Sequence, residues 1–388
     1  MDHPGSLSEV NPKLTVIYVC IDPTLGGSTA SLFTLIETVK DEVDPIVLFT
    51  RKGVAYDFFV AHGIESHVYP FIMLHKFQRN RLIDVWHHPW RWHPVKKWKT
   101  DRNCVRFLKE KLDGRKVGII HTNTSPNDVG VCLSRAFRAK HVWHVRECLD
   151  DHDGFELYGG RERLIRKING ADARIAISSY VRDHWKMKEQ DTYLIHDAVC
   201  AKEDAVYLPE KEKYVLFTSY NLTEAKGSRI AIEAFGKSRL SENGFRLVLM
   251  GNCKDDYKVS LMATAREVGC AQDIEFLPCQ SQVKPVIEKA SALVMASRYE
   301  GLGRVTAEAM FYGCPVIAHA SGGTLDLVRD GETGYLFRDA DECAALLRKV
   351  CLHDHEAMVR QAQRFVMENL STDSYGARIL EVYRSILS

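Results

Sequence analysis

Two glutamates flank a glycine-rich loop in the C-terminal half of the chain. Glu300 lies in the loop itself, and Glu308 lies about one turn into the segment with helical character that follows Gly303. A glycine loop that leads into a helix leaves backbone N–H groups unpaired and facing forward, which suits a diphosphate. A carboxylate accepts two hydroxyl hydrogen bonds at once, as the vicinal diol of a ribose requires. The pattern predicts Glu300 near a sugar and Glu308 near a nucleoside, although either residue alone would also fit a solvated position.

The residues after Glu308 extend this pattern. The chain continues with Ala309-Met310, then with Gly-Cys-Pro-Val-Ile-Ala at residues 313–318, and then with a glycine pair at residues 322–323. In this order the segment resembles the signature of glycosyltransferase family 4, a large group of retaining enzymes. That signature is a glutamate, seven residues, a second glutamate followed by alanine, G-x-P-V-I-A and a later glycine pair. The family usually has phenylalanine where Leu302 stands, which is a conservative difference.

The resemblance implies a fold and a set of donor contacts. The fold is GT-B, in which two Rossmann-like doubly wound α/β domains face each other across a cleft. Glu308 would bind the ribose hydroxyls of a nucleotide sugar, and Glu300 would contact the donor sugar as a catalytic residue. The backbone around Gly303, Arg304 and Val305 would hold the diphosphate.

Cations that neutralise the departing diphosphate follow the first strand of the second domain in this family. Lys226-Gly227 matches the lysine-glycine pair of the family and makes Lys226 a catalytic candidate, although a lysine considered alone would fit a solvated helix start. The usual arginine is absent, and its place falls at or near Asn221, which is itself a candidate donor contact. Arg304 or Arg229 are candidates to replace that arginine.

The first domain offers two further motifs. Gly26-Gly27 follows the first strand and resembles the family's glycine loop near acceptor and phosphates, although an ordinary tight turn also fits. His144 and Arg146 alternate along a strand and therefore project to the same side. The family often places a histidine facing the donor sugar at this strand end, which implies a catalytic His144 with Arg146 on the acceptor side. A histidine buried at the domain interface, and an ion pair of Arg146 with Glu147, are the alternatives.

Residues 75–106 interleave tryptophans with cations, and their only acidic residues are Asp84 and Asp101. Tryptophans among cations suit the headgroup layer of an anionic membrane. The segment predicts peripheral membrane binding and a lipid-linked acceptor; a sugar-stacking acceptor wall, or an insertion that buries its tryptophans, would also fit. No RNA or DNA motif accompanies the patch, so a nucleic-acid partner is not expected. The acceptor or membrane candidates are Trp86, Trp90, Trp92, Lys96 and Lys97.

The resemblance also implies a mechanism. The acceptor hydroxyl attacks the face from which the nucleoside diphosphate departs, and the leaving phosphate takes the proton, so that no protein nucleophile, metal or cofactor is required. Catalysis then consists of positioning and electrostatics. Asp151-His152-Asp153 spells an acidic triplet that binds metal in another glycosyltransferase fold, but it follows a polar segment and is interpreted as a solvated loop.

The donor and the reaction type have alternatives at this level. A UDP-sugar is favoured by family frequency, with a GDP-sugar next, and the product would belong to surface polysaccharide or glycoconjugate assembly. A sugar phosphorylase, a nucleotide-sugar epimerase or a non-catalytic nucleotide-sugar-binding protein would reuse the same loops. The presence of both glutamates of the family signature, Glu300 and Glu308, speaks against the non-catalytic alternative.

The elements that must position these residues alternate between apolar strands and segments with helical spacing. Such alternation predicts two doubly wound domains. We expect domain boundaries at 1–200 and 201–370 with a polar linker at 197–213, and a C-terminal helix at 371–388 that crosses back to the first domain. The predicted strands are residues 14–21, 45–49, 66–69, 117–121, 141–145, 173–177 and 192–196, and then 214–218, 245–250, 273–277, 292–296 and 315–318.

Composition narrows the setting. The 388 residues exceed what one core usually organises, and a formal net charge of +1 favours no particular partner. The eleven cysteines show no C-x-x-C pair, which fits a reducing compartment, and no segment reaches about 18 uninterrupted apolar residues. We therefore expect a cytoplasmic protein, peripheral on the cytoplasmic face of a membrane.

Overall fold

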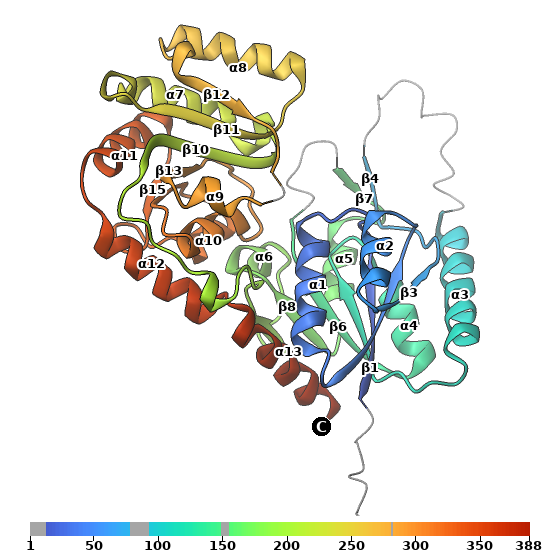
Figure 1. The fold of residues 1–388 in the computed structure, drawn as a ribbon. Helices are drawn as coiled ribbons and strands as arrows, with labels where there is room; N and C mark the ends of the chain where they lie inside the picture. Colours follow the sequence, from blue (N-terminus) through green and yellow to red (C-terminus); the bar gives the residue numbers. More distant parts are fainter. Residues whose placement is uncertain (1–12, 78–92, 149–154, 281) are drawn as a thin grey trace, which may run out of the picture.

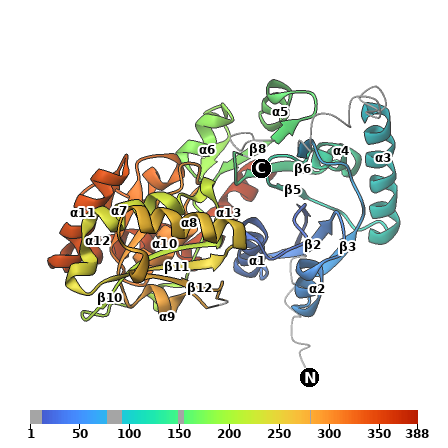
Figure 2. The ribbon, with the colours of Figure 1, turned by 90° about the horizontal axis from the view of Figure 1, so that it is seen from above.

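The computed structural model describes residues 13–77, 93–148, 155–280 and 282–388. Within them the chain forms two α/β units, each built on a parallel sheet with helices on both faces (Figure 1). Seen from above, the units lie side by side, with α1 (Gly27–Val39) and α6 (Ser179–His184) on the side of the first unit that faces the second (Figure 2).

The first unit has a seven-stranded sheet in the order β3-β2-β1-β5-β6-β8-β9. Alternate residues of β1 enter two different cores, with Val16 and Tyr18 on the face covered by α1, and Ile17 and Val19 on the opposite face. This burial on both faces explains the nearly continuous apolar run of the strand. The strands are β1 Leu14–Cys20, β2 Val43–Phe49, β3 Glu65–Val68, β5 Ile119–Asn123, β6 Lys140–Val145, β8 Ala173–Ala176 and β9 Thr192–Leu194. The other helices are α2 Val54–Ala61, α3 His93–Leu112, α4 Val129–Phe137 and α5 Arg161–Ile168.

The second unit has a six-stranded sheet in the order β12-β11-β10-β13-β14-β15. All of its strand pairs are parallel, and short helical turns connect several of its elements. Its strands are β10 Glu212–Asn221, β11 Arg246–Asn252, β12 Ile274–Leu277, β13 Ala290–Met295, β14 Val316–His319 and β15 Tyr335–Phe337. Its helices are α7 Ser228–Ser238, α8 Asp255–Glu267, α9 Lys284–Ile287, α10 Arg304–Phe311, α11 Ala340–Leu352 and α12 Glu356–Asn369.

Each sheet reverses its strand order once, next to its first strand. The reversal lies between β1 and β5 in the first sheet and between β10 and β13 in the second. In open parallel sheets, ligands bind outside the carboxyl ends of the strands at such a switch point. The glycine loop after β1 and the segments that hold Lys226 and Glu300 follow three of these four strands, so the topology brings them to the expected places.

The twelve strands predicted from the sequence are confirmed, with shifts of up to three residues at their ends. Two short strands, β4 His75–Phe77 and β7 Phe155–Leu157, form a separate antiparallel pair that the sequence did not predict. The edge strand β15 was also missed. These three strands have three residues each, which is too short for a periodic pattern.

Helix α13 (Thr372–Leu387) returns to the first unit and lies against α1 (Figure 1). Tyr375, Ile379 and Tyr383, which share the helical spacing noted in the sequence, are buried there. The two segments that connect the units lie side by side. The amide of Val199 donates to the carbonyl of Leu370, and Cys200 forms a parallel β-bridge with Ser371. In the described part of the chain, none of the helices combines the length and apolar character needed to cross a bilayer.

The contact between α13 and α1 depends on a glycine. A Cβ built at Gly376 would lie 2.4 Å from the carbonyl oxygen of Thr38. Any residue other than glycine would therefore clash unless the two helices moved apart. Alanine normally stabilises a helix interior by up to about 1 kcal/mol relative to glycine. We expect Gly376→Ala to act in the opposite direction and to lower the free energy of unfolding by about 1–3 kcal/mol, because the close approach is lost.

Denaturant unfolding of Gly376→Ala beside Ala377→Ser, a change at an exposed neighbour on the same helix, measures this effect. Equal or higher stability of Gly376→Ala would show that the helices are free to separate at this point.

Candidate functional site

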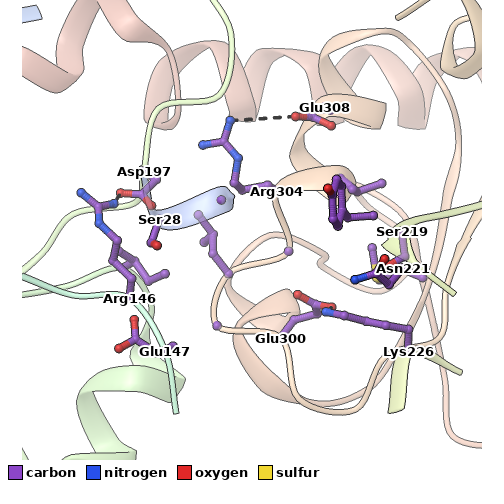
Figure 3. A pocket seen from close by; sticks show the side chains of 18 of the residues that line it. Ser28, Arg146, Glu147, Asp197, Ser219, Asn221, Lys226, Glu300, Arg304 and Glu308 are labelled. Atoms are coloured by element: carbon purple, nitrogen blue, oxygen red, sulfur yellow. Dashed lines mark hydrogen bonds and ion pairs between the residues drawn. The ribbon is translucent and has the colours of Figure 1, made fainter. Parts of the chain in front are cut away.

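A large cleft lies between the two units, at the carboxyl ends of both sheets (Figure 3). It encloses about 710 Å³, which is within the range of sites for ligands of drug or nucleotide size. Its walls come from the loops after β1, β6, β10 and β13 and from the first turns of α10. The predicted residues that line it are Gly27, Arg146, Asn221, Lys226, Glu300, Gly303, Arg304, Val305 and Glu308.

Lys226 and Glu300 form an ion pair within this cleft. The Nζ atom of Lys226 donates to Oε1 of Glu300 at 2.7 Å, and their side chains are 36% and 17% exposed. The pair joins the loop after β10 to the loop after β13, which are neighbouring strands of the sheet. Both groups therefore face the same cleft, and each compensates the charge of the other.

Helix α10 begins at the cleft with Arg304, directly after Gly303. Its first backbone N–H groups, those of Arg304 and Val305 among them, stand where an α-helix leaves donors without partners inside the helix. Glu308 lies one turn further, with its Oε1 4.0 Å from Nη2 of Arg304. Burial raises the pKa of the Glu308 carboxyl, and the positive charge of Arg304 opposes the rise. The site thus presents a helix N-terminus between two acids.

The structure distinguishes between the two arginines that could replace the family's missing cation. Arg229 turns away from the cleft and hydrogen-bonds Glu224, Thr264 and Ser260, on the side of α8. Arg229 is therefore excluded as a cleft residue. Arg304 lines the cleft, as does Asn221, at the place where the family's arginine is expected.

The first unit contributes the N-terminus of α1. Gly27 and Ser28 line the cleft, whereas Gly26 precedes the helix and is not among the lining residues. A Cβ on Gly26 would lie 2.6 Å from a carboxylate oxygen of Asp22, so the first glycine shapes the turn and the second faces the cleft.

His144 does not lie in the cleft, which corrects the expectation that it faces a donor sugar. It is fully buried behind the wall, where its Nδ1 lies 3.2 Å from Nε2 of His121 and 3.3 Å from Nη2 of Arg146. Burial lowers the pKa of both histidines well below the usual value, so both are neutral. His144 and Arg146 are two residues apart and therefore project to the same side. Arg146, which comes later and so lies nearer the carboxyl edge of the sheet, reaches the cleft, whereas His144 does not.

Arg146 is held in the cleft wall by a buried ion pair with Asp197. The carboxylate of Asp197 accepts hydrogen bonds from the guanidinium of Arg146 and from the hydroxyl of Tyr375, the latter at 3.0 Å. The Nε atom of Arg146 also donates to Oδ1 of Asn123 at 2.7 Å. Helix α13, which carries Tyr375, therefore reaches the site through Asp197. Arg146 therefore pairs with Asp197, and not with Glu147 as the alternative interpretation of the sequence suggested.

Glu147 follows Arg146 and also lines the cleft. The backbone amide and the hydroxyl of Ser125 donate to its Oε1 at 2.6 and 2.7 Å. Burial nevertheless raises the pKa of Glu147. Asp197, Ser28 and Ser219 also line the cleft but were not assigned to it from the sequence. Ser28 directly follows the glycine pair, whereas Asp197 carries no local signal, because it meets Arg146 only after the intervening βαβ elements fold.

The two units touch directly beside the cleft. A Cβ on Gly301 would lie 2.5 Å from the carbonyl oxygen of Arg146, so only glycine allows the loops to approach this closely. The hydroxyl of Ser178 donates to the carbonyl of Gly301, and the amide of Ser179 donates to Asp326 at 2.6 Å. Glu300 and Arg146, which flank these contacts, are thereby brought to opposite walls of one cleft.

The basic and aromatic segment is described only in part. Trp86, Trp90, Trp92 and the triplet at residues 151–153 lie outside the described residues. In α3, Lys96 is exposed, but Lys97 is buried and its Nζ lies 2.7 Å from carboxylate oxygens of both Asp101 and Asp128. Lys97 therefore stabilises the first unit from within, which corrects its assignment to an acceptor or membrane surface.

Two facing doubly wound sheets with a cleft at their switch points define the GT-B fold. The similarity to solved structures extends over nearly the whole chain. The Anabaena protein Alr3699/HepE in complex with UDP superposes with a TM-score of 0.78 over 96% of this chain and 100% of that one, at 19% sequence identity.

The second unit carries the sequence similarity. Residues 201–365, less than half of the chain, match the model of the family described as glycosyl transferases group 1. The lipopolysaccharide 1,6-galactosyltransferase of Salmonella typhimurium is 27% identical over 178 residues, or 44% of this chain and 49% of that protein. The trehalose synthase of Pyrococcus horikoshii is 28% identical over 187 residues, or 46% of this chain and 45% of that protein. The match thus spans about half the length of these relatives.

The Arg146–Asp197 pair generates a stability prediction. Asp197→Ala would leave the Arg146 charge buried without its carboxylate, and removal of one partner of a buried ion pair costs about 3–5 kcal/mol. We expect the free energy of unfolding to fall by this amount in denaturant titrations. Tyr375→Phe, which removes only one hydrogen bond to the same carboxylate, should lower the free energy of unfolding by at most about 3 kcal/mol.

A loss below 1 kcal/mol for Asp197→Ala would mean that water compensates Arg146 and that the pair does not hold the cleft wall in place.

Proposed function

We propose that the protein is a glycosyltransferase that moves a sugar from a nucleoside diphosphate sugar to a hydroxyl group of a glycan or lipid-linked acceptor. The observation that carries this proposal is that Glu300 and Glu308 line one cleft on either side of the N-terminus of α10. A diphosphate at that N-terminus would place its nucleoside next to Glu308 and its sugar next to Glu300. The match of residues 201–365 to the group 1 family supports this assignment.

The donor is proposed to be a UDP-sugar, with a GDP-sugar as the second choice. The support is that the similar Anabaena structure contains UDP, and that a relative of the second unit is a galactosyltransferase. Surface polysaccharide or glycoconjugate assembly is the proposed pathway, since that relative acts on lipopolysaccharide.

The proposed reaction retains the anomeric configuration and needs neither a metal ion nor a cofactor. Lys226, with the amides at the start of α10, stabilises the charge that develops on the leaving diphosphate, which is electrostatic catalysis in a prearranged site. The acceptor hydroxyl approaches between Glu300 and the first-unit wall formed by Arg146 and Glu147, and the leaving phosphate takes its proton. Glu300 orients the donor sugar once a ligand loosens its pair with Lys226.

A nucleotide screen tests the donor assignment. Thermal shifts of the protein are recorded with UDP, GDP, ADP and dTDP; a ligand at a hundredfold excess over Kd stabilises the folded state by about 2.7 kcal/mol. We expect UDP to give the largest shift and Glu308→Ala to remove most of it, because lost hydrogen bonds to a charged group cost about 1.5–3 kcal/mol.

Glu267→Ala, at an exposed position of α8, is the matched control and should keep the full shift. The proposal fails if none of the four nucleotides stabilises the protein at millimolar concentration. An assay that supplies an acceptor glycan with either a UDP-sugar or phosphate then separates a transferase, which releases UDP, from a phosphorylase, which releases a sugar phosphate.

We further propose that α3 binds the surface of an anionic membrane on the cytoplasmic face. Its outer side presents Val95 and Trp98, which are 56% and 62% exposed, with Lys96 and Lys99 beside them. The guanidinium of Arg102 lies 5.6 Å from the centre of the Trp98 ring. Apolar side chains that are surrounded by cations fit the headgroup layer, where each cation adds about 1 kcal/mol.

Liposome flotation with vesicles that contain anionic lipid tests this surface. Lys96→Glu with Lys99→Glu should lower the bound fraction at least tenfold at low salt, because two positive charges next to the membrane are replaced by two negative ones. Lys109→Glu with Lys111→Glu makes the same charge change in the last turn of α3 and serves as the control. If both double variants lowered binding equally, membrane binding would depend on the net charge of the protein, and the proposal of a specific surface on α3 would be wrong.

A further inference from the structure

Three cations line the cleft within the described residues, and they differ in how their charges are compensated. Arg146 is paired with Asp197, and Lys226 with Glu300. Arg304 instead donates its hydrogen bonds to neutral groups, and its ion pair with Glu308 is long, at 4.0 Å. Arg304 is therefore the cleft cation with the least compensated charge.

The position of Arg304 increases this imbalance. It is the first residue of α10, where the helix dipole is positive and backbone donors lack partners within the helix. Its side chain is only 27% exposed, so water screens the charge incompletely. A cation and a helix N-terminus that face the same partly buried space favour an anion there.

The same side chain connects the two units. Nη1 of Arg304 donates to the hydroxyl of Ser31 in α1 at 2.8 Å and to the carbonyl of Ala198 at 3.2 Å. Ser31 is buried, so this contact is fixed from the side of the first unit. A guanidinium has five N–H donors, and these two bonds use two of them. The remaining donors can bind a phosphoryl oxygen while the bridge to the first unit stays in place.

We propose that Arg304 binds the diphosphate of the nucleotide and, through Ser31 and Ala198, couples nucleotide binding to the contact between the two units. The inference rests on the proposed function, because it takes a nucleoside diphosphate as the ligand of the cleft. Arg304 thereby fills the place of the arginine that the loop at Asn221 lacks. A bound diphosphate fixes the guanidinium from a third side and holds the two units together more firmly.

Coupling of this kind is reciprocal, which makes it measurable from the first unit. Ser31 contacts Arg304 and lies outside the set of residues that line the cleft. Loss of its hydroxyl should still weaken nucleotide binding, because Arg304 loses the anchor that holds it in place. This effect should vanish when Arg304 is already absent.

The experiment measures the Kd of UDP by calorimetry, and of the nucleoside uridine by ligand-observed NMR. We expect Arg304→Met to weaken UDP by about 10- to 100-fold, as for one hydrogen bond to a charged group, and to leave uridine unchanged. Arg304→Lys should retain part of the UDP affinity, because the charge remains. Ser31→Ala should weaken UDP by about 2- to 10-fold in the wild type and should have no effect in Arg304→Met.

The outcomes separate this inference from the proposed function. If UDP binds the wild type and Glu308→Ala weakens it, but Arg304→Met does not, only the role of Arg304 is wrong. An equal loss of UDP and uridine affinity in Arg304→Met would assign Arg304 a purely structural role. A Ser31→Ala effect that persists in Arg304→Met would refute the coupling. If UDP does not bind at all, both proposals fall.

Discussion

The strands of each sheet are parallel, so the polar residues that follow them gather on one edge, and the site exists only where two such edges face each other. The sequence similarity covers the second unit, which supplies Lys226, Glu300 and Glu308. Arg146 and Glu147 come from the first. The set of residues that face each other across the cleft therefore depends on how the two units are held together.

Three kinds of contact hold the edges together. Helix α13 crosses back and lies against α1, with the backbone of Gly376 next to that of Thr38. The linker runs beside the start of α13, so that both chain crossings occur at one place. Beside the cleft, the loop at Gly301 touches the backbone at Arg146, and the hydroxyl of Ser178 donates to Gly301. The crossings hold the units together at their base, and the loop contacts set the distance across the cleft.

Electrostatic balance connects this architecture with the proposed chemistry. The buried Arg146–Asp197 pair, supported by Tyr375 of α13, makes the first-unit wall rigid. Behind it, the neutral pair His121–His144 continues to Tyr383 of the same helix, whose hydroxyl lies 2.7 Å from Nδ1 of His121. The C-terminal helix is thus linked to the cleft by two chains of buried polar groups. By contrast, the Lys226–Glu300 pair is partly exposed, so that a ligand can reach both of its members.

The alternation of strands and helices and the loops that carry Lys226, Glu300 and Glu308 could be predicted from the sequence, and the resemblance of the segment from Glu300 to Gly323 to a known family implied the GT-B class. These features are local, because a buried parallel strand, a glycine loop and a helix start are each encoded within a few neighbouring residues. The short strands β4, β7 and β15 were not predicted; each has three residues, too few for a period that would distinguish a strand. Three placements became visible only in the folded molecule. Arg146 rather than His144 reaches the cleft, and Lys97 is buried against Asp101 and Asp128. Arg229 turns away from the cleft, whereas Arg304 bridges to Ser31. Each of these depends on partners that are distant in sequence or on the depth of a side chain within the fold, and spacing along the chain encodes neither.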